Sequence, residues 1–218
     1  MNTTQRLVKL DGILTEHDEG EWSNSHSNYM AFNDAGLECE TGEFMYGMMR
    51  ILKPLNVLET GTHWGVGASY MGLGILDNHF GHLDTIEFLP EIHKVAQKRI
   101  ERLGLTAQVT CHFGDVAKFE PTVKYDFILL DTEPQTRFAE LLKFYPYLNE
   151  GGYLFIHDLH PHMHQIPNEE HGFAWPYGLI PKAMADLVKT GKLRPMHFKT
   201  PRGLTGFYKV DSNDYKWQ

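Results

Sequence analysis

The chain has 218 residues, a length that suits one domain or one domain with an appendage. Hydrophobic residues make up 42% and charged residues 22%, which is ordinary for a soluble folded domain and excludes a mainly disordered chain. The net charge of −8 and the scattered basic residues argue against a nucleic-acid surface. No apolar run approaches the ~18 residues that a membrane-spanning helix needs. We therefore expect neither nucleic acid nor a membrane as a partner.

The cysteine content indicates the compartment. Cys39 and Cys111 are too few for a disulfide framework, and the N-terminal segment has no apolar core of the secretory type. A reduced, cytoplasmic setting is the expectation.

Two parts of unequal length are expected along the chain. Residues 1–40 are polar and irregular and are interpreted as an N-terminal cap or loop, and residues 41–218 as one domain. Thr41 can cap the first helix of this domain, which is expected to run to about Lys53 before a proline ends it. The apolar face of that helix is expected to contain Phe44, Met48 and Ile51.

Apolar and amphipathic segments alternate through the rest of the chain. Strands are expected over 56–59, 82–87, 107–112, 125–130 and 153–156. Helices are expected over 67–76 and 90–103, with a further helix face at Phe138, Leu141, Leu142 and Tyr145. This alternation predicts an α/β fold with a doubly wound, parallel sheet of the Rossmann type. Two strand-like segments at 193–200 and 203–210, around a Pro-Arg-Gly turn, predict a C-terminal antiparallel hairpin.

A glycine-rich turn follows the first expected strand, with the sequence ETGTHWGVG at 59–67. Glycines at this place allow a tight turn and let a ligand approach the backbone. The free N–H groups at the start of the next helix attract anionic or polar groups. The turn is therefore a candidate cofactor site, although a tight turn without a ligand has the same composition.

Two acidic residues follow the next two strands. Glu87 ends the second strand, where a carboxylate can accept both hydrogen bonds of a ribose diol. Asp115 follows the third strand, where a carboxylate can meet an adenine amino group. Glu87 could instead cap the helix that begins at Pro90, and Asp115 could cap the next turn. Together with the turn, the two acids favour a cofactor that contains a nucleoside.

Two such cofactors compete. The glycine spacing resembles that of short-chain dehydrogenases, which bind a nicotinamide dinucleotide, but none of the tyrosines has the lysine four residues later that hydride chemistry demands in those enzymes. Glu59, directly before the turn, favours a cationic amino-acid group, which S-adenosylmethionine (SAM) has and NAD lacks.

The stretch from about 42 to 210 resembles the class I SAM-dependent methyltransferases, within the O-methyltransferase group that includes macrocin O-methyltransferase and the cephalosporin hydroxylase-like proteins. The segments that carry the resemblance are GEFMYGMMRILKPLNVLETGTHWGVGASY, TIEFLPE, FGDV, YDFILLDTEPQTR and LNEGGYLFIHD. The resemblance implies that Glu59, Gly61 and Gly65 hold the methionine end of SAM, Glu87 the ribose and Asp115 the adenine. The neighbours that complete this cofactor set are Thr62 and Val116.

A candidate metal site follows the fourth and fifth strands. Asp131 ends the fourth strand, and His157 and Asp158 end the fifth. Neighbouring strands lie about 4.8 Å apart, and two carboxylates at that separation repel each other unless a proton or a cation lies between them. A hard ion such as Mg²⁺ would fit, and His157 would tolerate softer divalent ions. The alternative is that Asp131 and Asp158 cap turns or support the cofactor loop.

Such an ion would lower the pKa of an acceptor hydroxyl and orient it for methyl transfer. Asp131 is therefore counted among the catalytic candidates. In the resembled group, an acid two residues beyond the first metal ligand can serve as general base, and here that position holds Glu133 rather than Asp. His157 also replaces the first of the two acids that are usual at the fifth strand.

The region 159–181 contains four prolines and is expected to be a long loop or lid. His160, His162 and His164 alternate within it, so on an extended segment they could share one face as ligands, or they could simply be solvated.

The resemblance implies an enzyme that transfers a methyl group from SAM to a hydroxyl of a small molecule, such as a sugar or a natural product, with divalent-metal assistance. A NAD-dependent oxidoreductase and a non-catalytic cofactor- or metal-binding protein are the alternatives. The sequence leaves a homo-oligomer open.

Overall fold

The computed structural model describes residues 36–133, 135–159, 182–198, 200 and 202–212. The three alternating histidines of the predicted loop and most of the predicted N-terminal segment lie outside these residues. The chain divides into two compact units, Met1–Lys118 and Phe119–Gln218. The division at residue 41 that the sequence predicts stays a prediction.

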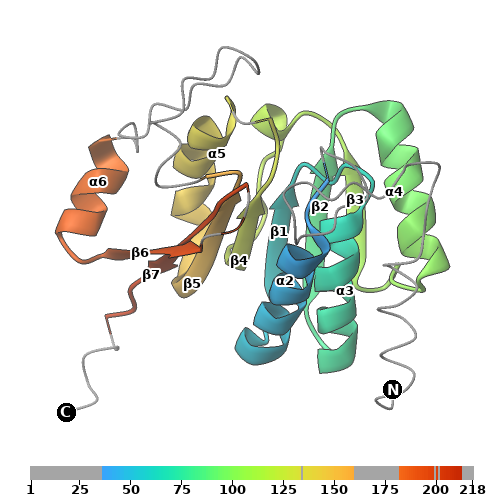
Figure 1. Ribbon diagram of the computed structural model, residues 1–218, viewed down its shortest axis with the longest axis horizontal. Coiled ribbons are helices and arrows are strands. Elements are labelled where there is room, and N and C mark those ends of the chain that lie inside the picture. Colours follow the sequence, from blue (N-terminus) through green and yellow to red (C-terminus); the bar gives the residue numbers. More distant parts are fainter. Residues whose placement is uncertain (1–35, 134, 160–181, 199, 201, 213–218) are drawn as a thin grey trace. The chain divides into compact units, whose positions relative to one another are not determined.

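The first unit contains three parallel strands with their connecting helices (Figure 1). Its elements are α2 (Cys39–Leu52), β1 (Asn56–Thr60), α3 (Val66–Asn78), β2 (His82–Glu87), α4 (Pro90–Arg102), β3 (Val109–Phe113) and a short 3₁₀ helix, η1 (Val116–Lys118). The strands lie in the order β3-β2-β1, so β2 pairs with both of the others. Because all three are parallel, their carboxyl ends meet at one edge of the sheet, where the candidate cofactor residues follow.

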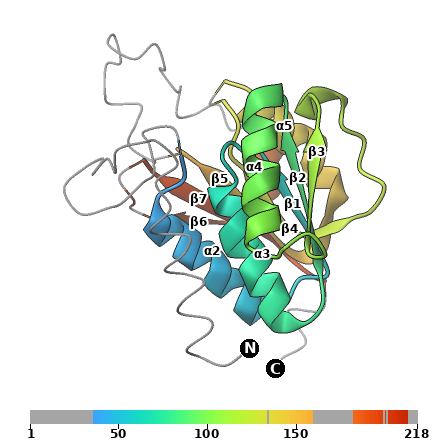
Figure 2. The same ribbon diagram turned by 90° about the vertical axis from the view of Figure 1, so that its right-hand side faces the viewer.

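Helices α2 and α3 lie side by side against this sheet (Figures 1 and 2). Helix α3 is buried from Val66 to Ile75, which explains its almost continuous apolar and small-residue sequence. A Cβ atom at Gly42 of α2 would come within 2.2 Å of the Tyr70 ring of α3. The absence of a side chain at this glycine therefore allows the two helices to approach closely.

The prediction for α2 was wrong in two respects. The helix begins at Cys39, and Thr41 lies within it, with its hydroxyl donating to the Glu38 carboxylate. The buried face contains Met45 and Met49, whereas Ile51 is 77% exposed. Apolar residues occur on every face of this segment, so periodicity alone did not define the inner one. The face that carries the small residue Gly42 packs inward.

Among the described residues, the second unit contains four strands. Its elements are β4 (Tyr125–Leu130), α5 (Arg137–Phe144), the 3₁₀ helix η2 (Tyr145–Tyr147), β5 (Leu148–His157), α6 (Lys182–Lys189), β6 (Leu193–Phe198) and β7 (Leu204–Lys209). The order is β4-β5-β7-β6, in which β4 and β5 are parallel while β7 is antiparallel to both of its neighbours. The predicted C-terminal hairpin is confirmed, and so is the mostly parallel α/β fold class.

Helix α5 differs from its predicted face. Leu142 is 46% exposed, while the buried positions include the charged residues Arg137 and Glu140. These two side chains belong to a polar network at the carboxyl ends of β4 and β5, which hydrophobic periodicity cannot reveal. None of the helices in the described part of the chain is long and apolar enough to cross a membrane.

Candidate functional site

The turn after β1 has the backbone geometry that its glycines predict. Gly61 and Gly65 both have φ near +80°, in the left-handed region that favours glycine, and Gly65 directly precedes α3. The N–H groups of Gly61 and Thr62 donate to the carbonyl oxygen of Ile86, at 3.0 and 3.1 Å. The turn is therefore fixed to the end of β2, beside the second predicted cofactor element.

Glu59 is held in a buried position under this turn. Only 2% of the residue is exposed, and its Oε2 atom accepts a hydrogen bond of 2.6 Å from the Thr85 hydroxyl. The Thr85 hydroxyl has one proton, which it donates to Glu59. In the 2.5 Å hydrogen bond between the hydroxyl oxygens of Thr62 and Thr85, Thr62 is therefore the donor. A Cβ atom on Gly67 would lie 2.3 Å from the Oε1 atom of Glu59. The carboxylate is thus fixed against the first turn of α3.

Glu87 ends β2 and is 5% exposed. Its Oε2 atom accepts the N–H of His63, and its Oε1 atom accepts the N–H of Leu89, both at 2.9 Å. The second bond involves the residue just before α4, and the predicted alternative that Glu87 caps this helix stays a prediction. Each carboxylate oxygen can accept a further hydrogen bond, which leaves capacity for a diol.

Asp115 lies beyond β3, in a segment that the Gly114 N–H joins to the Glu87 carbonyl oxygen at 2.9 Å. Its Oδ1 atom accepts the N–H of Ala117 at 2.9 Å, so Asp115 caps the short helix η1. Val116, the next residue, is buried. The predicted alternative of a turn cap is therefore present, and contact with adenine stays a prediction. All seven predicted cofactor residues belong to the first unit.

Sequence reasoning missed Thr85. Its side chain is fully buried and joins Glu59 to Thr62. The one signal available was a polar residue inside an otherwise inward-facing strand segment. Tertiary pairing of β1 with β2 places Thr85 directly opposite Glu59.

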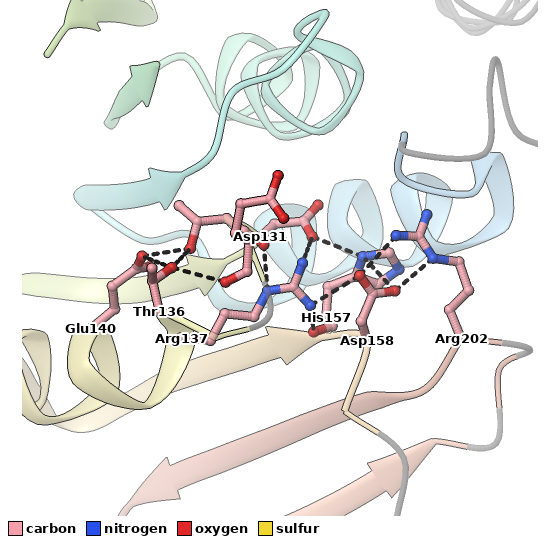
Figure 3. A network of polar contacts seen from close by, with 9 residues as sticks. Asp131, Thr136, Arg137, Glu140, His157, Asp158 and Arg202 are labelled. Atoms are coloured by element: carbon pink, nitrogen blue, oxygen red, sulfur yellow. Dashed lines mark hydrogen bonds and ion pairs between the residues drawn. The ribbon is translucent and has the colours of Figure 1, made fainter. Parts of the chain in front are cut away.

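The second unit brings together the three predicted metal ligands (Figure 3). Asp131 follows β4, His157 is the last residue of β5, and Asp158 comes next. The Nδ1 atom of His157 lies 2.8 Å from Oδ1 of Asp131 and 3.6 Å from Oδ1 of Asp158. One candidate ligand atom from each residue lies within 4.8 Å of the others.

Arg137, which the sequence did not single out, lies among these residues (Figure 3). It is the first residue of α5, and its side chain is 4% exposed. Its Nη2 atom donates to Asp131 at 3.2 Å, and its Nη1 atom forms an ion pair with Asp158 at 3.0 Å. Nε donates to the Thr132 carbonyl oxygen at 2.7 Å, and Nη1 also donates to the His157 carbonyl oxygen. The guanidinium group thus joins the ends of both strands.

Arg202 contributes a second guanidinium group from the turn between β6 and β7. Its Nη2 atom donates to Oδ2 of Asp158 at 2.7 Å, and its Nε atom lies 2.6 Å from Oδ1. Burial raises the pKa of Asp158, but His157, Arg137 and Arg202 together outweigh burial and lower this pKa well below its ordinary value. Asp158 is therefore ionised at neutral pH.

These contacts bear on whether the residues fit a divalent ion. Oδ1 of Asp131 and both carboxylate oxygens of Asp158 already lie within ion-pair distance of guanidinium nitrogens, and two positive charges offset two negative ones. The cluster as arranged therefore does not fit a divalent ion unless Arg137 moves away. The three residues meet as predicted, while a metal among them stays a prediction.

Glu133, the predicted base, lies in the loop between β4 and α5 with an exposed side chain. Its carbonyl oxygen accepts the Thr136 N–H at 3.0 Å and the Thr136 hydroxyl at 2.8 Å, which shapes the start of α5. The single proton of the Thr136 hydroxyl can be donated instead to the buried Glu140 carboxylate, at 3.0 Å, and Thr132 donates to the same carboxylate at 2.5 Å. The role of Glu133 as a base stays a prediction.

Comparison with known proteins gives one family match. Residues 58–159 match the family described as "Methyltransferase domain". The matched segment begins in β1 and ends just after β5. A catechol O-methyltransferase from Niastella koreensis is 29% identical over 123 residues, covering 54% of this chain and 54% of the relative. A protein-L-isoaspartate O-methyltransferase from Ignicoccus hospitalis is 29% identical over 180 residues, covering 78% of this chain and 77% of the relative.

Solved structures share the fold over nearly the whole chain. An O-methyltransferase from Bacillus cereus in complex with SAH has a TM-score of 0.67 at 16% identity, covering 93% of this chain and 91% of that protein. The O-methyltransferase TomG from Streptomyces achromogenes in complex with SAM has a TM-score of 0.63 at 16% identity, covering 97% and 100%. The resemblance to class I SAM-dependent O-methyltransferases that the sequence indicates is confirmed, while the narrower group within them stays a prediction.

Proposed function

We propose that the chain binds SAM and transfers its methyl group to a hydroxyl of a small molecule, because residues 58–159 match the family described as "Methyltransferase domain". One observation carries the proposal. The buried Glu59 carboxylate is held beside the start of α3 by the Thr85 hydroxyl, at the carboxyl edge of three parallel strands. A carboxyl group fixed at this place can, in its ionised form, accept hydrogen bonds from a cationic amino-acid group.

The first unit supplies a contact for each part of SAM. Glu59 and the backbone of the turn at Gly61 and Gly65 would hold the methionine end, with Thr62 supporting Glu59 through Thr85. At the end of β2, Glu87 would accept hydrogen bonds from the ribose hydroxyls. After β3, Asp115 and Val116 would contact the edge of the adenine ring. These roles agree with the burial of Glu87 and with the order β3-β2-β1 of the strands.

Methyl transfer is an in-line displacement at the sulfonium methyl group. The acceptor oxygen attacks the methyl carbon, the bond between carbon and sulfur breaks, and the hydroxyl proton must leave the acceptor. We assign that proton to Glu133, whose exposed carboxylate follows β4.

The resemblance also implies divalent-metal assistance. An ion bound by Asp131, His157 and Asp158 would supply a Lewis acid that lowers the pKa of the acceptor hydroxyl. Because Arg137 and Arg202 already hold both carboxylates, no step of the proposed reaction is assigned to an ion.

Cofactor binding tests the first part of the proposal. Isothermal titration calorimetry should show binding of SAM and SAH to the full chain and none of NAD. Glu59→Gln keeps an acceptor for the Thr85 hydroxyl but loses the charge, so both affinities should fall at least roughly tenfold. Glu91→Gln is the matched control, since Glu91 is 80% exposed and should leave the affinities unchanged. No heat with millimolar SAM would refute the proposal.

Methyl transfer tests the second part. The full chain would be incubated with SAM carrying a labelled methyl group and with separate catechol, sugar and isoaspartyl-peptide acceptors. Label transferred to a hydroxyl compound supports the proposal. Label transferred to the isoaspartyl peptide alone would replace the hydroxyl acceptor with a carboxylate, the acceptor class that the name of the Ignicoccus hospitalis relative indicates.

A further inference from the structure

The cluster after β4 and β5 is balanced in charge by its own side chains. Asp131 and Asp158 supply two carboxylates, and Arg137 and Arg202 supply two guanidinium groups within ion-pair distance of them. The side chains of all four residues are largely buried, with exposures between 4% and 20%. Groups so shielded from water interact strongly, so the electrostatic need that two close carboxylates create is already met.

Arg137 makes the contacts that a bound cation would make. Its guanidinium group reaches a carboxylate oxygen of Asp131 at 3.2 Å and one of Asp158 at 3.0 Å. It also donates to the carbonyl oxygens of Thr132 and His157. Four oxygen atoms from the ends of two neighbouring strands therefore surround one positive group, and oxygen atoms are the ligands that Mg²⁺ and Mn²⁺ prefer.

A divalent ion that bound the same oxygen atoms would have to lie beside the guanidinium group of Arg137, sharing these oxygens with it, or displace it. Sharing would place two further positive charges beside a buried guanidinium group, which is strongly unfavourable. Displacement would leave the guanidinium group of Arg137 without the acceptors that now satisfy it in a buried place.

We propose that Arg137 takes the place of the divalent cation in this cluster, so that the chain holds Asp131 and Asp158 together without a metal. Arg137 is then a positioning residue, which fixes the ends of β4 and β5 through Asp131 and the His157 carbonyl oxygen. Its significance for methyl transfer rests on the proposed function, which accordingly proceeds without a metal. The cluster itself is tested in the absence of SAM.

The experiment titrates Mn²⁺ into the full chain, with electron paramagnetic resonance and calorimetry as readouts. The wild-type chain should show no stoichiometric site up to roughly millimolar Mn²⁺. Arg137→Gln frees the oxygens and removes one positive charge, so this variant should bind one Mn²⁺ at least about tenfold more tightly. Arg137→Lys keeps the charge and should bind as weakly as the wild type. Adding Asp131→Asn to Arg137→Gln should abolish the gain.

A merely structural role for Arg137 would not create a metal site, so gained binding separates the two roles. Stoichiometric binding of Mn²⁺ to the wild type that Asp131→Asn abolishes would overturn the inference, and this measurement stands even if Arg137→Gln does not fold. If Arg137→Gln folds and still binds no Mn²⁺, the inference also fails. Methyl transfer that survives extensive dialysis against EDTA supports it, and loss that Mg²⁺ restores contradicts it. SAM binding is measured separately, so a failed cofactor site is distinguishable from a failed cluster.

Discussion

Single residues decide how the candidate cofactor site is held. The Glu59 carboxylate fits because Gly67 has no side chain, and it stays in place because Thr85 donates to it. The hydrogen bond from Thr85 offsets part of the cost of burying the polar Glu59 carboxyl group.

Gly67→Ala tests this tight fit. The new methyl group would lie 2.3 Å from Oε1 of Glu59, so the carboxylate or the helix must shift. We expect SAM affinity to fall and the chain to lose about 1–3 kcal/mol of stability, measured by calorimetry and by urea unfolding. Gly47→Ala is the control, since Gly47 of α2 has no atom within 4 Å of a new Cβ. Unchanged SAM affinity in Gly67→Ala would show that SAM binding does not depend on the present position of the Glu59 carboxylate.

The cysteines give a second prediction at this scale. Burial raises the pKa of the Cys111 thiol from 9.0 to about 12, with smaller contributions from Glu59 and Glu101, and burial raises the pKa of Cys39 to about 12. The reactive thiolate fraction at pH 8 is then roughly a thousandfold below that of a free cysteine. Mass spectrometry should show slow alkylation by iodoacetamide in the folded chain and rapid alkylation in urea. The folded rate should keep rising above pH 9. Rapid labelling of the folded chain at pH 8 would contradict these environments.

Among the helices, close contact between α2 and α3 determines how the elements of the first unit pack. Gly74 of α3 faces Met49 and the carbonyl oxygen of Tyr46 on α2, and Gly42 of α2 faces the Tyr70 ring. These glycines allow the approach that buries Met45 and Met49. The inner face of α2 is therefore defined by where small residues occur as much as by where apolar residues occur.

Gly74→Ala would place a Cβ atom 2.6 Å from Cβ of Met49 and 3.1 Å from the Tyr46 carbonyl oxygen. Alanine favours a helix by about 1 kcal/mol over glycine, but the clash should outweigh this gain and destabilise the chain by about 1–3 kcal/mol. Gly47→Ala, on the same pair of helices but without close neighbours, should instead stabilise it by about 0.5–1 kcal/mol. Urea unfolding of the two variants measures both signs. Stabilisation by Gly74→Ala would show that the helices can separate freely.

For the molecule as a whole, the binding of a ligand to the native state should appear as added stability. At a SAM concentration about 100 times the dissociation constant, linkage adds about 2.7 kcal/mol. For a chain of this length the midpoint of thermal unfolding should then rise by roughly 5–10 °C. Differential scanning calorimetry of the full chain with SAM, SAH and NAD measures this shift. A rise with NAD and none with SAM would favour the oxidoreductase alternative.

Features that depend on local chemistry could be predicted before the fold was known. The strands at 82–87 and 125–130 have the predicted bounds, because an apolar run between turn residues leaves little choice of conformation. Glu59 and Glu87 lie at strand ends as predicted, since parallel strands connected by helices must place such residues at one edge. The charged residues after β4 and β5 were likewise predicted to meet, and they do.

Tertiary structure alone decided what these charged groups contact. Thr85 meets Glu59 from 26 residues away, and Arg202 meets Asp158 from 44 residues away. In the sequence, nothing distinguishes Arg137 from other residues at the start of a helix, whereas in the structure its guanidinium group lies between two carboxylates. Sequence patterns report which residues share a face or a strand end, whereas the partner of a charge depends on which distant segments the packed chain brings within a few ångströms of it.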